Sequence, residues 1–352
     1  MISAVVVNWN GKHYLDECLE ALLAQSQTGD EVILVDNHSD DGSREFVAGR
    51  FPSVRIVDTG ANLGPAAARN VGLRSARHST VLLLDNDVVL APGALAKLGA
   101  RLASDPRIAV VQARSLCADS PEIVHYDAAD LHYLGMLVLH GWFRPRAELP
   151  VIAKEVGAFV ALCVLCDKLA LLAVGGFCER MFILYEDNQL SYKVRLAGRA
   201  IWHEPEAICL HKGGTAGLSV RGATAAYPAR RTFLHTRNRA LLVRTCMSLR
   251  TLVLTWPARA LYGVVQFLFA LGRGHLGAWG SAQWELLRLL PQTLRERRAV
   301  QASRSARDRD LLVAAPLSLN PGIAVRGFSA GVRRVLDAIF VGWWRLVRRA
   351  CG

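Results

Sequence analysis

Acidic side chains are scarce in the C-terminal part of the sequence. Residues 212–352 contain 5 Asp and Glu against 23 Lys and Arg, whereas residues 1–211 contain 25 acidic against 19 basic side chains. The whole excess of 12 positive charges therefore lies in the C-terminal part. This asymmetry indicates that the C-terminal part binds an anionic partner. We expect no nucleic acid in that role, because the sequence carries no recognition motif for it and its N-terminal part is acidic.

A long apolar run is also missing. The segment 249–271 is apolar but interrupted by charge, and its longest uncharged stretch, Ala260–Gly272, has 13 residues. A helix that crosses a bilayer needs about 20, so we expect this segment to enter the membrane interface without spanning it. The sequence opens without a charged region followed by an apolar core, and we therefore expect no secretion signal and a cytoplasmic location.

Paired cysteines are nearly absent. Of the eight cysteines, only Cys163 and Cys166 form a CxxC pair. A zinc site of that type needs two further ligands at suitable spacing, and a redox pair usually opens a helix. This pair lies instead in an apolar segment, which favours buried thiols and a reducing compartment.

The first 90 residues contain a regular alternation of strand and helix patterns. Apolar, β-branched runs predict strands, and apolar residues at helical spacing predict the helices between them. The predicted strands cover residues 2–8, 31–36, 54–58 and 80–85, and the predicted helices cover residues 14–25, 43–50 and 64–76. This alternation predicts right-handed crossovers and an α/β fold with a mostly parallel central sheet.

Less regular segments follow. We expect a buried strand over residues 156–167, a helix within residues 183–198 and a strand from residue 200 that ends at His211. Gly198 is suited to end that helix, because glycine readily adopts the left-handed backbone conformation found there.

Polar side chains end three of the four predicted strands in the first 90 residues. Asn8, Asp36 and Asp85 each stand at the last position. In a parallel sheet these ends meet at the carboxyl edge, where α/β folds bind ligands. We therefore expect Asp36 and Asp85 to face one crevice. Their carboxylates are tolerable there because they stand at the mouth of the core rather than inside it.

Asp85 begins an Asp-x-Asp triplet that ends with Asp87. Carboxylate oxygens are ligands for hard divalent ions such as Mg²⁺, which keep open positions for the phosphate oxygens of a substrate. Taken alone the triplet is weak evidence, because a solvated turn explains it about equally well. The surrounding sequence favours the metal site.

Several ordered segments resemble glycosyltransferase family 2, whose members are inverting nucleotide-sugar enzymes with a GT-A fold. These segments are VVVNWNG, EVILVDNHSDDGS, NLGPAAARNVGL, LLLDNDVVL, GGFCERMFILYEDNQLSYKVRLAG and EAICLHKGG. The match covers about residues 2–240 and looks closest to the rhamnosyltransferase-like members that build bacterial cell-surface polysaccharides. It implies a catalytic GT-A domain over residues 1–240, followed by a helical, basic C-terminal extension over residues 241–352.

The resemblance implies which residues bind the nucleotide sugar. Asp36 would hold the base or ribose near Asn8 and Asn10, and Arg69 would face the phosphates, a suitable use of a forked cation. The other implied binding residues are Asn37, Asn62, Gly64, Asn70, Asp85 and Asn86. Of these, Asn62, Gly64 and Asn70 would shape the loop and helix under the nucleotide. Turn and packing roles alone would also explain those three, and a surface position on a helix would explain Arg69.

The resemblance also implies a metal site and a catalytic base. For Mg²⁺ or Mn²⁺, Asp85 would contact ribose or metal, Asp87 would be a direct ligand and His211 a third protein ligand. Asp187 is implied as the catalytic base, with Glu186 beside it. An inverting transfer needs one carboxylate to take the proton of the acceptor hydroxyl as its oxygen attacks. Helix capping is the alternative role for Asp187, but it leaves Glu186 unexplained.

Two positions depart from the family pattern. Gln189 replaces the second acid of a Glu-Asp-x-Asp run, and Cys178 precedes Glu179 where the family often has Asp. Because Asp187 is retained, these changes affect the expected acceptor contacts and helix capping more than the chemistry.

Residues 332–349 combine apolar and basic side chains at helical spacing. One face would carry Val332, Leu336, Ile339, Phe340, Trp343 and Val347, and the other Arg334, Arg345, Arg348 and Arg349. This pattern is typical of a helix in an anionic membrane interface, although packing on its own domain would produce the same pattern. Peripheral attachment at the inner face of the cell membrane would suit an acceptor glycan carried on a polyprenyl diphosphate.

Two other functions compete with glycosyl transfer. A sugar nucleotidylyltransferase would need a Gly-rich loop with Arg and Lys after the first strand, where this chain has NWNGKHY. A non-catalytic GT-A scaffold at the membrane is compatible with the same fold, although the intact Asp36, Asp87 and Asp187 argue against it.

Overall fold

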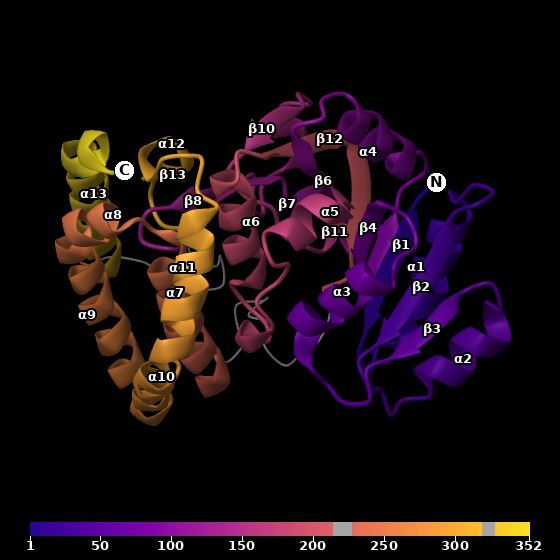
Figure 1. Cartoon of the computed structure of the whole chain (residues 1–352), viewed down its shortest axis with the longest axis horizontal. Helices are drawn as coiled ribbons and strands as arrows, with labels where there is room; N and C mark the ends of the chain where they lie inside the picture. The colour runs from indigo at the N-terminus through magenta and orange to yellow at the C-terminus, as the bar shows by residue number, and fades with distance from the viewer. Residues whose placement is uncertain (214–226, 319–327) are drawn as a thin grey trace. The chain divides into compact units, whose positions relative to one another are not determined.

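The structure is a computed structural model that describes residues 1–213, 227–318 and 328–352, and it contains two compact units (Figure 1). The first, called the sheet unit, comprises Met1–Ala129, Leu139–Val194 and Arg199–Gly214. The second, called the helical unit, comprises Asp130–Val138, Arg195–Gly198 and Thr215–Gly352. A large sheet and C-terminal helices agree with the predicted fold class. The domain boundary at residue 240 stays a prediction.

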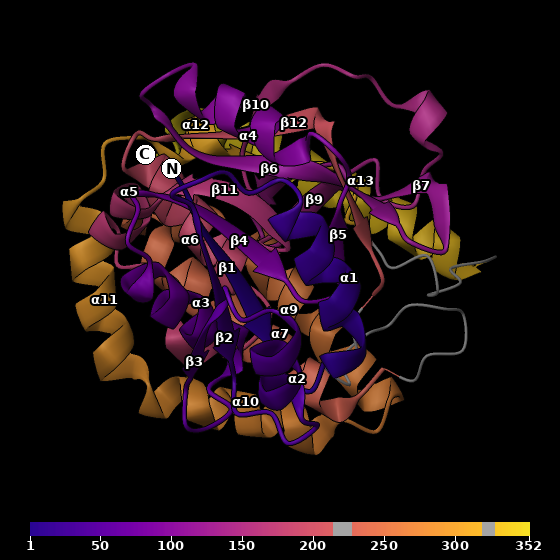
Figure 2. The same ribbon diagram turned by 90° about the vertical axis from the view of Figure 1, so that its right-hand side faces the viewer.

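The first four strands form the parallel part of the sheet that the alternation predicts. β1 (Ser3–Asn8) lies between β2 (Glu31–Asp36) and β4 (Thr80–Asp85), with parallel pairing on both sides (Figure 2). β3 (Arg55–Asp58) extends this part by pairing in parallel with β2. The connecting helices are α1 (Lys12–Leu23), α2 (Ser43–Arg50) and α3 (Gly64–Ser75), close to their predicted positions.

Beyond β4 the sheet is mixed rather than parallel. β11 (Cys163–Asp167) runs antiparallel to both β4 and β6 (Ile108–Cys117), and β12 (Ala200–His211) lies parallel to β6. The other strands of this sheet pair antiparallel with their neighbours, namely β5 (Val88–Leu90), β7 (Ser120–Tyr126) and β10 (Lys154–Val156). The expected end of β12 at His211 is confirmed.

The single strand predicted over residues 156–167 is wrong, because the structure has two strands with a break. β10 ends at Val156 and β11 begins at Cys163. Between them, the Phe159 N–H donates to Ser191 Oγ at 3.1 Å, and the Val160 N–H donates to Oε1 of Gln112 at 2.8 Å. Since side chains satisfy these backbone groups, the segment can be buried without a partner strand.

Apolar side chains form a core on each face of the sheet. One core includes residues of α1, α2 and α4 (Ala94–Ala103), and the other includes residues of α3, α5 (Lys168–Ala173) and α6 (Glu186–Leu196). Cys163 belongs to the first core and Cys166 to the second. All eight cysteines are among the described residues and none forms a disulfide, which confirms the expectation of thiols.

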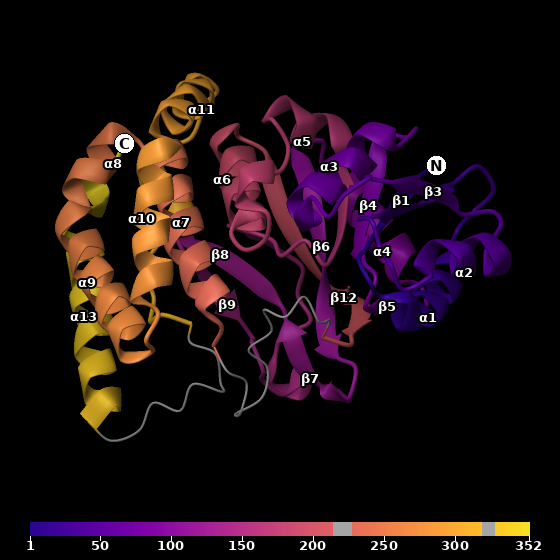
Figure 3. The same ribbon diagram turned by 90° about the horizontal axis from the view of Figure 1, so that it is seen from below.

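The helical unit contains most of the chain after residue 228. Its helices are α7 (Ala229–Cys246), α8 (Leu249–Leu254), α9 (Trp256–Gly272), α10 (Leu276–Arg288), α11 (Leu290–Ala302), α12 (Asp308–Leu311) and α13 (Phe328–Val347). Within this unit α9 packs against α10 and α13 (Figure 3). A second sheet has the strand order β13 (Leu312–Val313), β8 (Ala128–His132) and β9 (Leu137–His140). Among the described helices, none has both the length and the apolarity needed to cross a membrane.

Helix α13 packs on its own unit through part of the face predicted to meet lipid. Phe340 is 1% exposed, and the ring of the neighbouring Trp344 stacks on Tyr133 with centroids 5.0 Å apart. The Tyr133 hydroxyl donates to the Phe340 carbonyl at 2.9 Å. Val332 and Ile339 of the predicted face are exposed instead. Self-packing therefore accounts for Phe340, and lipid contact cannot involve that residue.

Candidate active site

The polar ends of the central strands meet at one edge of the sheet, as predicted. In the parallel register Asn8 lies opposite Asp36, and Val7 lies opposite Asp85. Nδ2 of Asn8 donates to Asp36 Oδ1 at 2.8 Å, and Oδ1 of Asn8 accepts from Asn86 Nδ2 at 2.6 Å. A chain of hydrogen bonds thus joins the centre of the Asp-x-Asp triplet to the ends of β1 and β2.

Gly11 makes this chain of bonds sterically possible. A Cβ atom at position 11 would lie 1.9 Å from Nδ2 of Asn86 and 2.8 Å from Oδ1 of Asn8. Any side chain there would displace the Asn86 amide from Asn8. Sequence reasoning missed this residue, although its place directly after the Asn8-Trp9-Asn10 run was visible in the NWNG segment.

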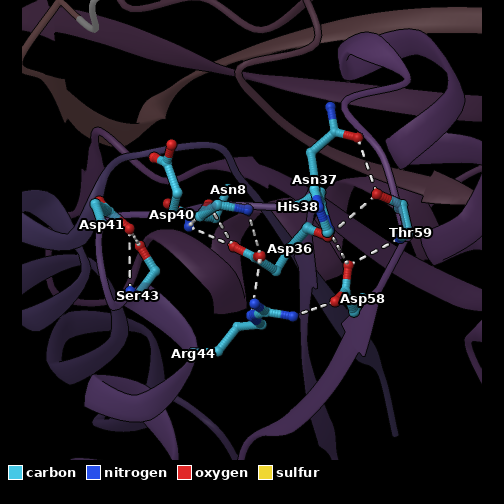
Figure 4. A network of polar contacts seen from close by, with 12 residues as sticks. Asn8, Asp36, Asn37, His38, Asp40, Asp41, Ser43, Arg44, Asp58 and Thr59 are labelled. Atoms are coloured by element: carbon cyan, nitrogen blue, oxygen red, sulfur yellow. Dashed lines mark hydrogen bonds and ion pairs between the residues drawn. The ribbon is translucent and has the colours of Figure 1, made fainter.

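Asp36 is fully buried and organises the loop that follows β2 (Figure 4). Its Oδ1 accepts from Ser39 Oγ at 2.6 Å and its Oδ2 from the Ser39 N–H at 2.8 Å, in addition to the bond from Asn8. Nε of Arg44 lies 3.7 Å from Asp36 Oδ2, and Arg44 also pairs with Asp58. In this arrangement protein groups surround the carboxylate. Direct contact with a base or ribose, which the resemblance implies, stays a prediction.

Ser39 and Arg44 are two further site residues that the sequence patterns did not indicate. An Asp whose carboxylate accepts from a backbone N–H a few residues later is a recognised turn signal, and DNHS in the sequence had that form. Ser39 Oγ also accepts from the Asn10 N–H at 2.9 Å, and Oδ1 of Asn10 accepts from the Asp40 N–H at 3.0 Å. Asn10 therefore shapes the loop from the β1 side.

A second loop is held by Asn37 and Asn62. Nδ2 of Asn37 donates to Oδ1 of Asn62 at 3.0 Å, and Oδ1 of Asn37 accepts from the Leu63 N–H at 2.9 Å. Oδ1 of Asn62 accepts from the Gly64 N–H at 3.0 Å. Gly64 has a φ of 81°, and a Cβ there would lie 2.6 Å from the Phe182 ring. These contacts agree with the predicted loop-shaping roles of Asn62 and Gly64.

Asn70 fastens helix α3 to the Gly-Gly-Phe segment. Its Nδ2 donates to the Phe177 carbonyl and to Glu179 Oε1, both at 2.9 Å, and its Oδ1 accepts from the Phe177 N–H at 2.9 Å. Gly176 lies so close that a Cβ there would be 2.6 Å from the Asn70 oxygen. Packing and hydrogen bonding thus account for Asn70.

Arg69 is buried between two carboxylates and does not lie on the surface. Nη2 donates to Asp85 Oδ1 at 2.8 Å, and Nη1 donates to Glu186 Oε1 at 3.1 Å. Burial disfavours the cation, but Asp85 and Glu186 outweigh that cost and raise the pKa of Arg69 above its usual value. The guanidinium therefore stays charged and links the Asp-x-Asp triplet to helix α6.

Glu186 and Asp187 are the first two residues of α6. Burial, together with the charge of Asp187, raises the pKa of Glu186 to about 8 in spite of Arg69. Burial also raises the pKa of Asp187, which Arg69 opposes. Oδ1 of Asp187 accepts from the Asn188 N–H at 2.8 Å, a contact within the first turn. Desolvated carboxylates with raised pKa values are typical of groups that accept protons in catalysis.

The backbone just before α6 is strained. Phe182, Leu184 and Tyr185 have φ values of 63°, 70° and 73°. Bulky residues rarely adopt this left-handed conformation, which costs roughly 1–3 kcal/mol each. Such strain persists only where the surrounding structure imposes it, and here it lies directly before Glu186 and Asp187.

Asp87 and His211 lie next to each other. Asp87 Oδ2 and His211 Nε2 are 3.0 Å apart, and β5, which follows Asp87 directly, pairs with the end of β12 so that Val88 lies opposite His211. Asp85 bonds to Arg69 instead. In the described part of the chain, no three His, Cys, Asp or Glu side chains are grouped as a metal site.

The two adjacent side chains still fit a divalent ion. A carboxylate oxygen and an imidazole nitrogen suit Mn²⁺, and a carboxylate suits Mg²⁺. Both side chains are largely buried, with exposed fractions of 5% for Asp87 and 12% for His211. A pair of protein ligands leaves most of the coordination shell for phosphate oxygens. Asp87 and His211 are thus the two predicted ligands that lie together, and the metal site with its three predicted ligands stays a prediction.

Comparisons with known proteins bear on the same part of the chain. Residues 3–146 match the profile of the family described as Glycosyl transferase family 2. The chain is 28% identical over 234 residues to N-acetylglucosaminyl-diphospho-decaprenol L-rhamnosyltransferase of Mycobacterium tuberculosis. The aligned region covers 60% of this chain and 76% of that protein. The chain is also 29% identical over 330 residues to pre-mycofactocin glycosyltransferase of the same organism. This aligned region covers 92% of this chain and 62% of that protein.

A solved structure shares the fold. GalNAc-T7, determined with UDP, GalNAc and Mn²⁺, superposes with a TM-score of 0.58 at 16% identity, over 74% of this chain and 50% of that one. The present chain thus spans half the length of that protein. The likeness establishes the fold expected from the sequence.

Proposed function

We propose that this chain is a glycosyltransferase of family 2 that transfers a sugar from a nucleotide-diphosphate donor to a hydroxyl acceptor, with inversion and with a divalent ion. The observation that carries the proposal is the meeting of the Asp-x-Asp triplet with the carboxylates that open α6. Arg69 joins them through its bonds to Asp85 and Glu186, which lies 117 positions farther along the chain. A link of this kind holds a donor-binding edge and a proton acceptor in fixed relation.

The donor nucleotide would lie against the loops at the carboxyl ends of β1, β2 and β4. Asp36 keeps the first loop in shape through Ser39 and Asn8, and the Asn37–Asn62 pair keeps the second. We therefore assign Asp36 chiefly an organising role, with base and ribose contacts made by the loop that it holds.

Asp87 and His211 would hold Mg²⁺ or Mn²⁺. When bound, the ion supplies positive charge against the leaving diphosphate. GalNAc-T7 was solved with Mn²⁺, which supports testing that ion first. Asp85, held by Arg69, would be the nearer partner of the ribose.

Asp187 would be the base. Its carboxylate takes the acceptor proton while the hydroxyl oxygen bonds to the anomeric carbon and the bond from that carbon to the diphosphate breaks. The bonding pair leaves with the diphosphate oxygen, and attack from the opposite face inverts the centre. Desolvation strengthens Asp187 as a base, because it raises the pKa of the carboxyl.

The name of one relative supports a proposal for the acceptor class. The name of the rhamnosyltransferase specifies a diphospho-decaprenol carrier, and we propose a lipid-linked glycan of the cell envelope for this chain. Such an acceptor lies at a membrane surface, which agrees with the basic C-terminal part.

Helix α9 offers a face suited to that surface. Exposed apolar side chains recur along it at helical spacing, namely Trp256, Val264, Phe267, Leu268 and Leu271, with exposed fractions of 64%, 53%, 36%, 56% and 50%. Arg250 and Arg273 lie beyond its two ends and are exposed. An apolar stripe with flanking arginines favours the interface of an anionic membrane. We propose that the enzyme binds the inner face of the cell membrane through this stripe, without spanning it.

Turnover measurements test the proposal. Purified chain is incubated with UDP-, dTDP- and GDP-sugars, Mn²⁺ and membrane extract containing polyprenyl-diphosphate glycans, and released nucleoside diphosphate and product mass are recorded. We expect one donor class to react, with loss of about 10²–10⁴-fold in Asp187→Asn and unchanged donor binding. Donor binding without turnover across all acceptors would instead favour a non-catalytic scaffold.

A further inference from the structure

A second histidine lies directly behind His211. Nδ1 of His125 and Nδ1 of His211 are 2.7 Å apart, and the two ring centroids are separated by 4.5 Å. His125 is 2% exposed, so this contact is shielded from water. At that distance one ring donates its N–H and the other accepts, which fixes how the two rings face each other.

An irregularity in the sheet directs His125 to this position. In the pairing of β6 with β7, Ser115 lies opposite Tyr126 but Leu116 lies opposite Val124. His125 is therefore the extra residue of a β-bulge. Bulges turn a side chain away from its regular direction and are frequent beside active sites.

Aromatic rings also contact His125. Its ring meets that of Phe143 edge-on, with centroids 5.6 Å apart, and the Phe143 N–H donates to the Val124 carbonyl at 2.8 Å. This packing leaves the His125 ring little freedom to rotate. His125 is thus a rigid support rather than a mobile group.

We propose that His125 is a positioning residue for His211. Because Nδ1 of His211 is engaged by His125, its other nitrogen, Nε2, points at Asp87, where the proposed ion would lie. Metal-bound histidines generally need such a partner on the second nitrogen, and its loss typically costs 10–100-fold in metal affinity. This inference rests on the proposed function, since it requires the Asp87–His211 metal site.

Three substitutions separate positioning from simple space filling. His125→Asn places an amide atom where Nδ1 was, whereas His125→Gln places it nearer the position of Nε2. His125→Phe fills the space with no hydrogen-bonding group. If only packing matters, Phe should be tolerated at least as well as Asn. If the Nδ1 contact matters, Asn alone should restore function.

The test is Mn²⁺ binding by the full chain, measured from the signal of free Mn²⁺ in electron paramagnetic resonance, with thermal melting to verify folding. We expect His125→Phe and His125→Gln to bind Mn²⁺ about 10–100-fold more weakly than wild type, and His125→Asn to recover most of the loss. Wild-type affinity in a folded His125→Phe variant would overturn the role of His125. Equal losses in the Asn and Gln variants would also contradict it.

The Asp87→Ala variant separates a failure of the proposed metal site from a failure of the proposed role of His125. Saturable binding in wild type that is lost in Asp87→Ala establishes the metal site, whatever the His125 variants do. If wild type itself shows no saturable binding, the metal site fails and the role of His125 fails with it.

Discussion

Arg69 and Asp85 form a partly buried ion pair in which Nη2 of the buried Arg69 donates to Asp85 Oδ1 at 2.8 Å. The first carboxylate of the Asp-x-Asp triplet is therefore held by a protein cation. The same guanidinium donates to Glu186. One side chain thus joins the proposed donor-binding edge to helix α6, which carries the proposed base, so disturbing Arg69 should affect both stability and turnover.

Arg69→Lys should be strongly destabilising although it keeps the charge. A lysine ammonium lacks the planar fork that reaches both carboxylates, and a buried carboxylate without its partner costs about 3–5 kcal/mol. Urea unfolding measures the loss. Arg74→Lys is the matched control on the same helix, because its pair with Glu179 is exposed and such pairs contribute about 0–1 kcal/mol. Equal effects of the two substitutions would contradict the bridging role.

Gly11→Ala should weaken nucleotide binding. The added Cβ would occupy the place of the Asn86 amide, 1.9 Å from Nδ2, and break the hydrogen bond that ties Asn86 to Asn8. Titration of a nucleotide sugar should give a lower affinity than wild type. Gly49→Ala is the control, because nothing lies within 4 Å of its Cβ and Ala should stabilise α2 by roughly 0.5–1 kcal/mol. A Gly11→Ala variant with wild-type affinity would refute the steric argument.

Stability should depend on pH through Asp127. Burial alone would raise the pKa of Asp127, but His203 and Arg114 outweigh it and lower that pKa below its ordinary value. Nε of Arg114 donates to Asp127 at 2.6 Å, and Arg114 is fully buried. A lowered native pKa stabilises the fold above the unfolded value of about 3.9, and this contribution disappears as pH falls through the native pKa.

Asp127→Asn should therefore cost about 3–5 kcal/mol at pH 7, and the difference from wild type should shrink below about pH 4. Urea unfolding of both proteins between pH 7 and below pH 4 tests whether the difference in their stability shrinks on acidification. Asp16→Asn is a control with an exposed carboxylate and should change little. A difference between Asp127→Asn and wild type that grows on acidification would be incompatible with this assignment.

Replacing Trp256, Phe267 and Leu268 by serine should abolish binding to vesicles of anionic phospholipid in a flotation assay, with the helical content retained. Each buried apolar side chain contributes roughly 1.5–3 kcal/mol on transfer from water. Val151 and Ile152, exposed in the sheet unit at 59% and 68%, offer a control pair for the same change to serine. Unchanged binding of the triple variant would place the membrane contact elsewhere. A different result would be that wild type does not bind vesicles but associates with itself as its concentration rises, and that the triple variant does not. That result would indicate that a second copy of the chain covers the apolar stripe of α9.

The strand ends were predictable because they depend on local patterns. Asn8, Asp36 and Asp85 close apolar runs of strand length, and parallel pairing then brings them to one edge. His211 was placed by the end of its own strand, and its approach to Asp87 follows from the pairing of β5 with β12. In these cases residues distant in sequence are brought together by the sheet itself.

Other features depend on tertiary contacts that no local pattern encodes. Arg69 lies on a helix whose spacing is compatible with a surface position, and only its neighbours Asp85 and Glu186 explain its burial. His125 is directed by a bulge that depends on the register between two strands. The apolar run over residues 156–167 fits a strand, but Ser191 and Gln112 satisfy its backbone from other elements.

The central claim is a metal-dependent donor site at the carboxyl edge of the sheet. It is tested most directly by thermal unfolding of wild type and Asp87→Ala with UDP-, dTDP- and GDP-sugars, each with and without Mn²⁺ or Mg²⁺. A ligand that binds only the folded protein must raise its melting temperature. We predict stabilisation by one nucleotide class that requires the metal and is lost in Asp87→Ala. The absence of any shift in wild type, or an equal shift in Asp87→Ala, would contradict the account.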